Sequence, residues 1–242
     1  MKAIVQSCDR YHSMAQNMLV QYEKLWPSNP FTFRVPWNEK YPEVIENQFG
    51  SKIELINAGI KFKQTFHALT KDLDDNDWVY WCIDDRYLIS IEEGEANQVL
   101  NFVESIKNPN IINVCFHFVR YIKDSANCIQ REGSGVEIYF ENLRFIQHKS
   151  FINNWLHQFF RVKALREFWR HIEEPPQYQA IQMDYSTKPL NGISLTLDHN
   201  ISRYGESTEG GTITKNCQNS CIENNISIPK IFLSKKQKTI II

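Results

Sequence analysis

The segment from Asp77 to Ile89 constrains the fold more than any other part of the sequence. An apolar run, WVYWCI, is followed by two adjacent carboxylates, Asp84 and Asp85, after which apolar residues resume. Apolar runs of this length that are rich in aromatic and β-branched residues are typical of strands buried on both faces. Because burying unpaired carboxylates is costly, such a strand should end where the two aspartates begin. The sequence therefore predicts a buried strand whose C-terminal end carries a carboxylate pair.

The elements around this strand predict an α/β fold. Strand-like segments alternate with segments whose apolar residues have helical spacing. The expected strands before the aspartates are 2–8, 31–36 and 52–56, and the expected helices are 14–26 and 60–73. A helix over 92–106 and strands over 111–119 and 136–140 follow. This order predicts a Rossmann-like, mostly parallel central sheet flanked by helices. Ligands bind such sheets at the carboxyl ends of the strands, where the aspartates lie.

The remaining chain predicts a helical region followed by a tail. The stretch from Phe145 to His171 is the most aromatic, and its apolar spacing predicts one or two helices. Arg161, Lys163, Arg166 and Arg170 give it one basic face, and the first three are candidates for contact with an anionic acceptor or a phospholipid surface. From His199 onward, Ser, Gly, Asn and Thr predominate, which predicts a loop-rich tail. We expect a single domain over 1–242, divided into 1–119, 120–198 and 199–242.

Composition excludes several classes of protein. The 27 basic and 28 acidic residues give a net charge of −1, so nothing favours nucleic acid as a partner. No apolar stretch is long enough to span a bilayer, and the N-terminus has no signal-peptide pattern. Six scattered cysteines are typical of reduced thiols in a cytoplasmic protein. Cys217 and Cys221 have no second Cys/His pair at zinc-site spacing, so no zinc site is predicted.

The aspartate pair allows two interpretations. Two carboxylates at a strand end form a hard-oxygen site suited to Mg²⁺ or Mn²⁺ holding a substrate phosphate. Aspartate is also common at turns and helix N-caps, where it has a purely structural role. The aromatic strand and the α/β order before the pair favour the functional interpretation.

Three segments together resemble a known family. Ser7-Cys8-Asp9-Arg10 follows the first expected strand, and Asn57-Ala58-Gly59 opens an expected helix. Trp81-Cys82-Ile83-Asp84-Asp85 is similar to an Asp-x-Asp segment, with Ile83 in the place of the first aspartate. Over residues 1–119 the chain resembles the nucleotide-sugar half of GT-A fold glycosyltransferases.

The resemblance implies a set of ligands and roles. The donor would be a nucleoside diphosphate sugar, and the acceptor a saccharide or a lipid-linked saccharide. Asp85 and His199 would bind Mn²⁺ or Mg²⁺, and Arg203 and Lys215 would bind the diphosphate. The nucleotide would contact Ser7, Asp9, Arg10, Gly59, Lys63 and Asp84. The segment from Gly205 to Gly211 would supply a flexible loop over the phosphates.

The sequence does not single out one residue as the general base for the acceptor hydroxyl. The carboxylates that could deprotonate it are Glu137, Glu173, Glu174 and Asp184, and only an inverting enzyme would need one. A sugar nucleotidyltransferase shares the sheet and the metal chemistry, but its first loop is expected to be glycine-rich and to contain lysine. The loop after the first strand here contains no glycine. A third alternative is a binding or assembly protein that kept this fold without the chemistry.

Overall fold

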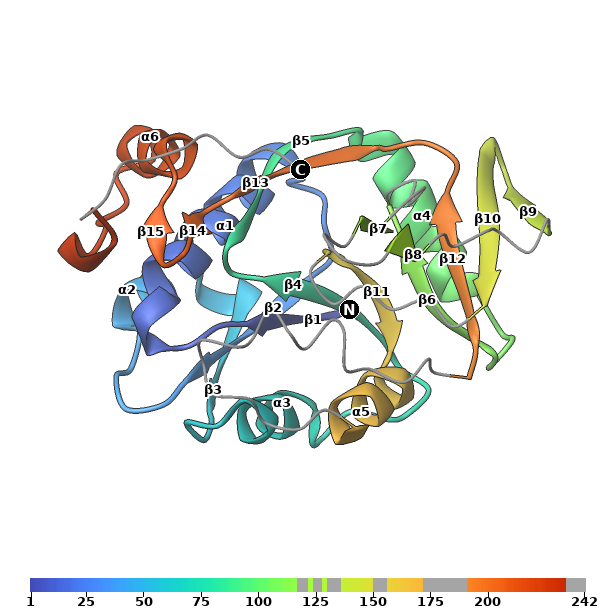
Figure 1. Cartoon of the computed structure of the whole chain (residues 1–242), viewed down its shortest axis with the longest axis horizontal. Helices are drawn as coiled ribbons and strands as arrows, with labels where there is room; N and C mark the ends of the chain where they lie inside the picture. The colour runs from blue at the N-terminus through green and yellow to red at the C-terminus, as the bar shows by residue number, and fades with distance from the viewer. Residues whose placement is uncertain (117–121, 124–127, 130–135, 150–155, 172–190, 234–242) are drawn as a thin grey trace. The chain divides into compact units, whose positions relative to one another are not determined.

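The computed structural model describes residues 1–116, 122–123, 128–129, 136–149, 156–171 and 191–233 (Figure 1). These residues belong to two compact units. The first unit contains Met1–Lys71, Tyr80–Glu93 and Ser202–Ile242, and the second contains Asp72–Val79 and Gly94–Ile201. Both combine β-strands with α-helices, so the predicted α/β class is confirmed.

The sheet of the first unit has the strand order β3-β2-β1-β4. Strands β1 (Lys2–Gln6), β2 (Thr32–Trp37) and β3 (Ile53–Asn57) are parallel neighbours, as predicted. Strand β4 (Trp78–Ile83) lies on the other side of β1 and begins with two residues of the second unit. Because β1, β2 and β3 are parallel, their carboxyl ends meet at one edge, where a ligand site is expected.

Helices α1 (His12–Leu25) and α3 (Phe62–Thr70) cover opposite faces of this sheet (Figure 1). Tyr80 and Trp81 are successive residues of β4, so their side chains point to opposite faces. The Tyr80 hydroxyl is 2.9 Å from that of Tyr22 in α1. The Trp81 ring is 6.3 Å from the ring of Phe66 in α3. The first unit further contains the short helices η1 (Asp9–Tyr11), α2 (Glu43–Phe49) and η2 (Gly50–Lys52).

The last part of the chain completes the first unit with regular structure instead of the loop-rich tail expected there. Strand β13 (Ser202–Glu206) pairs antiparallel with β5 (Arg86–Ile91). A hairpin of β14 (Thr208–Glu209) and β15 (Thr212–Ile213) follows, and then α6 (Lys215–Glu223) and η4 (Lys230–Leu233). Gly210 and Gly211, with φ of 57° and 76°, form the hairpin turn. Short polar strands give little periodicity, so the sequence did not reveal them.

The sheet of the second unit has the order β11-β6-β12-β10-β9. Strands β6 (Ile111–Cys115) and β12 (Ile193–Leu197) are parallel, while β11–β6, β12–β10 and β10–β9 are antiparallel pairs. This unit also contains α4 (Glu93–Ser105), a small pair of strands, β7 (Ile122–Lys123) and β8 (Cys128–Ile129), and β9 (Glu137–Phe140).

The stretch from Phe145 to His171 contains strands as well as the predicted helix. Helix α5 (Val162–His171) is present, but β10 (Leu143–Lys149) and β11 (Gln158–Arg161) replace the expected helix before it. The prediction of helix was therefore wrong for these two segments. Aromatic residues from two separate strands produced an apparent helical spacing, although Phe159 and Phe160 are both fully buried by sheet packing.

Two arginines of the expected basic face have structural partners inside the second unit. The Arg161 guanidinium lies 4.3 Å from the centre of the Trp78 ring and donates to the Ile106 carbonyl at 2.8 Å. Arg166 pairs with Asp75 at 2.5 Å and donates to the Leu73 carbonyl. Both guanidinium groups thus have partners within this unit, and their contact with an anionic acceptor or a lipid surface stays a prediction. Among the described helices, none has the length and apolar character needed to cross a bilayer.

Candidate functional site

Asp84 and Asp85 form a two-residue turn between β4 and β5. The Asp84 amide donates to the Gln6 carbonyl at 3.2 Å, which ties the turn to the end of β1. The Asp85 carbonyl accepts from the Ser207 amide at 2.6 Å, which ties it to the chain entering β14. The predicted position of the aspartates at the end of a buried strand is confirmed. The turn is held on two sides by the backbone.

Burial disfavours the charged form of both carboxyl groups. Burial raises the pKa of Asp84 well above its usual range, and the neighbouring Asp85 raises it further. The Ser7 hydroxyl lies beside this carboxyl and offsets part of the rise, without a well-formed hydrogen bond. Burial also raises the pKa of Asp85, against the effect of Arg86. The Asp85 Oδ1 atom is buried and has no hydrogen-bond partner among the described residues.

This arrangement fits a divalent cation that shares its coordination with a substrate. A cation would supply the missing positive charge at Asp84 and a partner for the Asp85 Oδ1 atom. Within the described ranges, no three His, Cys, Asp or Glu side chains are grouped so that they could hold a metal ion. Mg²⁺ commonly binds through one or two carboxylates and takes its other ligands from water and substrate phosphates. The pair therefore suits a substrate-bridged ion and not a cage made only of protein ligands.

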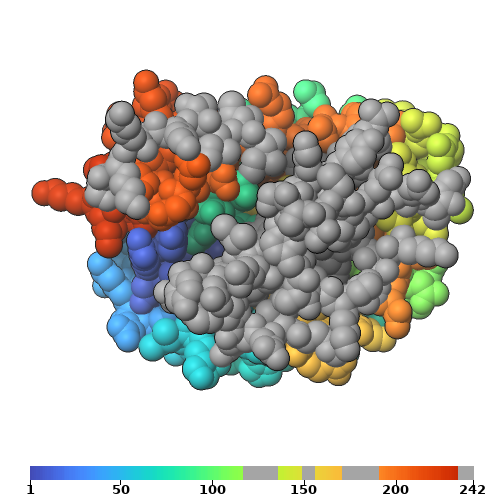
Figure 2. Space-filling model, in the orientation of Figure 1, coloured from blue at the N-terminus to red at the C-terminus, as the bar shows by residue number. Residues whose placement is uncertain are grey.

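The end of β1 borders the aspartate turn with an aromatic and cationic surface. The Tyr11 and Phe232 rings are 5.3 Å apart, and the exposed Arg10 guanidinium lies 5.6 Å and 5.4 Å from their centres. Burial raises the pKa of the Tyr11 hydroxyl, and both aspartates add to the rise while Arg10 opposes it. Figure 2 shows orange residues of the C-terminal part beside dark-blue residues of the N-terminal part on this face. Chain segments far apart in sequence thus form one rim.

Asp9 organises the loop after β2. Its carboxylate accepts hydrogen bonds from the backbone amides of Asn38, Glu39 and Lys40, each at 2.8 Å. Burial alone would raise the pKa of Asp9, but these three donors lower it below the usual value. The carboxylate predicted to face a nucleotide is thus engaged by the backbone. Its contribution to a ligand site would be to shape the loop around it.

Asn38, which the sequence did not single out, joins the ends of β2 and β3. Its side-chain amide donates to the carbonyls of Ala58 at 3.1 Å and Gly59 at 2.7 Å. A Cβ atom on Gly59 would lie only 2.7 Å from the Cβ of Gln64, so glycine is needed for the close approach to α3. Lys63 follows in the first turn of α3 and is half-buried. The carboxyl ends of β1, β2 and β3 are therefore connected by side chains.

Replacing Asp9 by alanine should destabilise the first unit by about 1–3 kcal/mol at pH 7, since three amides lose a charged acceptor. Asp9→Asn should cost less because it keeps one acceptor oxygen. Urea denaturation followed by circular dichroism measures both. Because the pKa of Asp9 is lowered in the folded protein, its contribution is complete above the unfolded pKa of about 3.9 and is lost at lower pH. Equal stability of Asp9→Ala and the parent at pH 7 would contradict this role.

His199 has partners for both of its ring nitrogens within the second unit. Its Nδ1 atom lies 2.6 Å from Asp198 Oδ1, and its Nε2 atom lies 2.8 Å from Glu95 Oε2. Asp198 first, and then Glu95, raise the pKa of the imidazole. These contacts keep the ring between two carboxylates. The expectation that His199 binds the metal stays a prediction.

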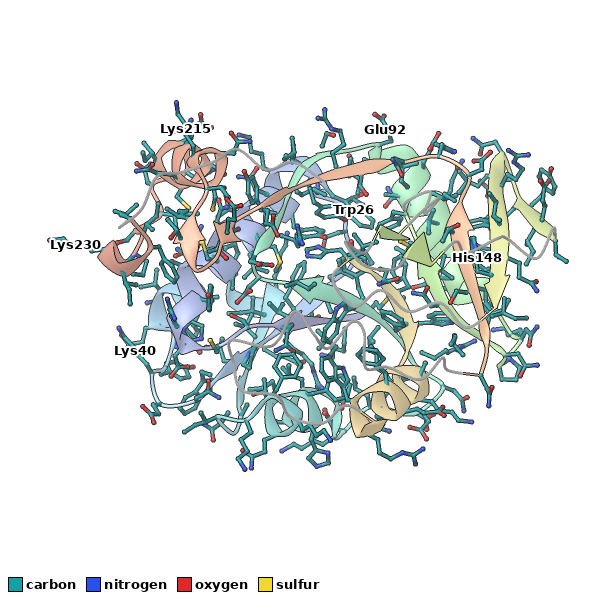
Figure 3. The ribbon with its side chains drawn as sticks, viewed as in Figure 1. Trp26, Lys40, Glu92, His148, Lys215 and Lys230 are labelled. Atoms are coloured by element: carbon teal, nitrogen blue, oxygen red, sulfur yellow. The ribbon has the colours of Figure 1, made fainter. Side chains whose placement is uncertain are left out.

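Arg203 and Lys215, the residues expected to hold phosphates, are both exposed on the first unit. In the β13–β5 pair, Arg203 is opposite Ser90, whereas Glu206 is opposite Arg86 next to the aspartates. At roughly 3.3 Å per residue, Ser90 and thus Arg203 lie about 13 Å along β5 from Arg86. Lys215 begins α6 and points outward in Figure 3. Binding of the diphosphate by either residue stays a prediction.

Arg86 is the basic residue that sequence reasoning missed. It directly follows Asp85, lowers the pKa of that carboxyl, and pairs with Glu206 at 3.0 Å. Its Nε and Nη1 atoms are buried and have no hydrogen-bond partner among the described residues. Its place immediately after the two aspartates was the available signal. Arg86 brings a positive charge and unused donors to the turn.

The expected acceptor-side carboxylates are only partly within the described residues. Glu173, Glu174 and Asp184 lie outside them. Glu137 is exposed on β9, where it pairs with Arg144 at 3.3 Å and accepts from the Tyr139 hydroxyl at 2.6 Å. The identity of a general base stays a prediction.

Asp84→Asn should stabilise the protein at pH 8 in the absence of divalent ions, although it removes a native side chain. The folded pKa of Asp84 is raised, so its stabilising contribution is complete below the unfolded pKa of about 3.9 and is lost as pH rises. Asparagine avoids ionisation in the buried position. We therefore expect the free energy of unfolding at pH 8 to be higher for Asp84→Asn than for the parent.

Urea denaturation at pH 8 and at pH 4 tests this prediction, with Glu223→Gln as the control on an exposed carboxylate of α6. The gain should shrink at pH 4, where the raised pKa keeps Asp84 of the folded parent largely protonated and therefore uncharged. A loss of stability at pH 8, or a gain that is the same at both pH values, would show that Asp84 does not carry an uncompensated charge.

Among known proteins, solved structures are similar to this chain, and their sequence identity to it is low. No protein-family model matches the chain, and no curated protein matches it. Solved structures with a similar arrangement include an active-site mutant of LgtC, with 11% identity, a TM-score of 0.43, and coverage of 78% of this chain and 71% of that one. The galactosyltransferase LgtC in complex with donor and acceptor sugar analogs has 12% identity, a TM-score of 0.41, and coverages of 78% and 72%.

A third similar structure is 4-diphosphocytidyl-2C-methyl-D-erythritol synthase, with 13% identity and a TM-score of 0.44. It is matched over 93% of this chain and 97% of its own. Structures that are this distantly similar do not indicate the reaction or the substrate of this chain.

Proposed function

We propose that this protein is a metal-dependent glycosyltransferase. It would move a sugar from a nucleoside diphosphate sugar to a hydroxyl group of a saccharide or lipid-linked acceptor. The observation that supports this most strongly is the Asp84–Asp85 turn, where two carboxyls with raised pKa adjoin the end of β1 and the Asp85 Oδ1 atom is buried without a partner. A site short of positive charge at a ligand-binding edge is suited to a cation and a diphosphate.

Asp85 would be the principal ligand of Mg²⁺ or Mn²⁺, and Asp84 would support it from the buried side of the turn. When bound, the cation stabilises the negative charge that develops on the departing diphosphate. The chain itself contributes preorganisation, since hydrogen bonds from Asp84 to Gln6 and from Ser207 to Asp85 hold the turn before any ligand arrives. Arg86, held by Glu206, would favour the ionised form of Asp85.

The rim at the end of β1 would contact the nucleotide. The half-buried Tyr11 ring and the exposed Arg10 guanidinium offer an apolar face and a positive charge next to the aspartates. Such a pair suits a base or ribose attached to an anionic diphosphate. Asp9 would act indirectly, because it holds the loop at Asn38 with which this rim is continuous.

Calorimetry with uridine, guanosine, cytidine and adenosine diphosphates, each with and without Mn²⁺, tests the proposal. We expect one nucleotide to bind in the presence of Mn²⁺ and to bind at least tenfold more weakly without it. Asp85→Asn should abolish the Mn²⁺ dependence, whereas Glu223→Gln should keep it. If no nucleoside diphosphate shows metal-dependent binding, or if Asp85→Asn retains it, the proposal is wrong.

The reaction products separate this function from its two alternatives. A glycosyltransferase releases a nucleoside diphosphate from the sugar donor, and slow hydrolysis of the donor occurs without an acceptor. A nucleotidyltransferase would release pyrophosphate from a nucleoside triphosphate and a sugar phosphate. A non-catalytic binding protein would do neither. The helix η1 follows β1 directly and contains no glycine, which does not favour a nucleotidyltransferase loop.

A further inference from the structure

Three sulfur atoms meet in the interior of the first unit, between helices α1 and α6. The Cys217 Sγ atom lies 3.8 Å from the Met14 Sδ atom and 4.0 Å from the Cys221 Sγ atom. All three side chains are fully buried. Met14 comes from the first turn of α1, whereas the cysteines are one turn apart on α6. The three sulfurs thus form a compact group, called the sulfur cluster below.

The spacing of the sulfur cluster suits a small soft ion. Metal–thiolate bonds are about 2.3 Å long, and three sulfurs at that distance around an ion in one plane are about 4.0 Å apart. The two separations from Cys217 Sγ, 3.8 Å to Met14 Sδ and 4.0 Å to Cys221 Sγ, are close to this value. Thiolate and thioether ligands together favour Cu(I) over harder divalent ions.

Zinc fits the sulfur cluster less well than Cu(I). Structural zinc sites almost always have four nitrogen or sulfur ligands in a tetrahedral arrangement. In the residues that the structure describes, no third His, Cys, Asp or Glu side chain completes such a group with the two cysteines. The third sulfur belongs to a methionine, and a thioether is a ligand that Cu(I) accepts.

The surroundings of Cys217 contain hydrogen-bond donors suited to a thiolate. The side-chain amide of Asn17, which is fully buried, donates to Cys217 Sγ at 3.6 Å. Its carbonyl oxygen accepts from the Ser220 hydroxyl at 2.9 Å, which fixes the orientation of the amide. The fully buried Ser207 hydroxyl lacks a well-formed hydrogen bond among the described residues and lies near Cys217. Such outer contacts are typical of metal ligands, since they orient the ligand and offset its charge.

We propose that Met14, Cys217 and Cys221 form a binding site for Cu(I), distinct from the proposed Mg²⁺ or Mn²⁺ site at Asp85. On binding, each cysteine thiol loses one proton to solvent, and two sulfur–copper bonds form together with a bond from the Met14 thioether. No electron is transferred, because the ion enters and stays as Cu(I). Asn17 and Ser207 would donate to the Cys217 thiolate in the bound form.

Titration of the full-length protein with Cu(I) tests the site under anaerobic, reducing conditions, in competition with a chromophoric Cu(I) chelator. Met14→Leu removes the thioether and nearly conserves the volume, so the fold should be retained. Met18→Leu is the matched control, since Met18 is also fully buried in α1, one turn further on. We expect the parent and Met18→Leu to bind one Cu(I) with equal affinity, and Met14→Leu to bind it at least tenfold more weakly.

The double variant Cys217→Ala, Cys221→Ala should lose this high-affinity ion, whereas Cys115→Ala, at a buried cysteine of the second unit, should retain it. Circular dichroism shows which variants are folded. X-ray absorption of the loaded parent should show three sulfur neighbours. Equal affinity of Met14→Leu and the parent, retention of the ion by the folded double variant, or the absence of a stoichiometric ion in the parent would each overturn the proposal.

Discussion

Asp85→Asn is expected to lower kcat/KM for sugar transfer at least a hundredfold, while the protein remains folded. Asparagine has nearly the same shape, but it removes the charge that would hold the cation against the diphosphate. Loss of one group that stabilises developing charge in a buried site typically costs a factor of about 100–1,000. The Asp85 Oδ1 atom has no hydrogen-bond partner among the described residues, so the substitution breaks no hydrogen bond at that atom.

The rate of nucleoside diphosphate release measures this effect, with the donor whose diphosphate binds in the calorimetric screen. Glu223→Gln serves as the control, because it changes an exposed carboxylate of the same unit. Raising the Mn²⁺ concentration should recover part of the lost rate if the substitution weakens metal binding. Unchanged kcat/KM in Asp85→Asn would show that the aspartate turn is structural, as its position between two strands also allows.

Trp26→Ala should cost about 3–5 kcal/mol of stability, the range usual for a large buried aromatic residue. Trp26 is fully buried after the end of α1, and Figure 3 shows it in the interior. Its ring meets those of Phe31 at 5.2 Å and Tyr80 at 6.4 Å, both edge to face. The Phe31 and Tyr80 rings are themselves stacked at 4.4 Å, so removing the indole leaves a cavity beside rigid neighbours. Domains are commonly stable by about 5–15 kcal/mol, so the effect is large.

Urea denaturation followed by far-ultraviolet circular dichroism measures the loss without depending on the fluorescence of the removed tryptophan. Ile60→Ala is a suitable control, because Ile60 is 68% exposed and its truncation should change stability by less than about 0.5 kcal/mol. A loss of stability below about 1 kcal/mol in Trp26→Ala would mean that the neighbouring Phe31 and Tyr80 rings move to fill the space of the indole.

Local sequence patterns predicted the helices and strands whose buried residues recur at a regular spacing along the chain. The strands β1, β2, β3 and β4 and the helices α1, α3 and α4 lie within a few residues of their predicted bounds. The aspartates end β4 as expected, because an unpaired carboxylate is excluded from a buried strand. The strands of the C-terminal part were missed, and two strands before α5 were mistaken for helix. Their partners in the sheets, and not their own periodicity, stabilise them.

The chain order of the first unit and the place of its carboxylate pair were determined by the sequence alone, since hydrophobic periodicity and the cost of burying charge act locally. Only the tertiary structure decided which groups those carboxylates meet. It brought Ser207 to Asp85, bound Asp9 to the amides of Asn38, Glu39 and Lys40, and placed Met14 against Cys217. Such contacts join residues up to 203 positions apart. These contacts arise from the packing of distant segments, so the residue pattern of a single segment does not predict them. The position of the aspartate turn thus follows from the sequence, whereas its surroundings follow from the fold.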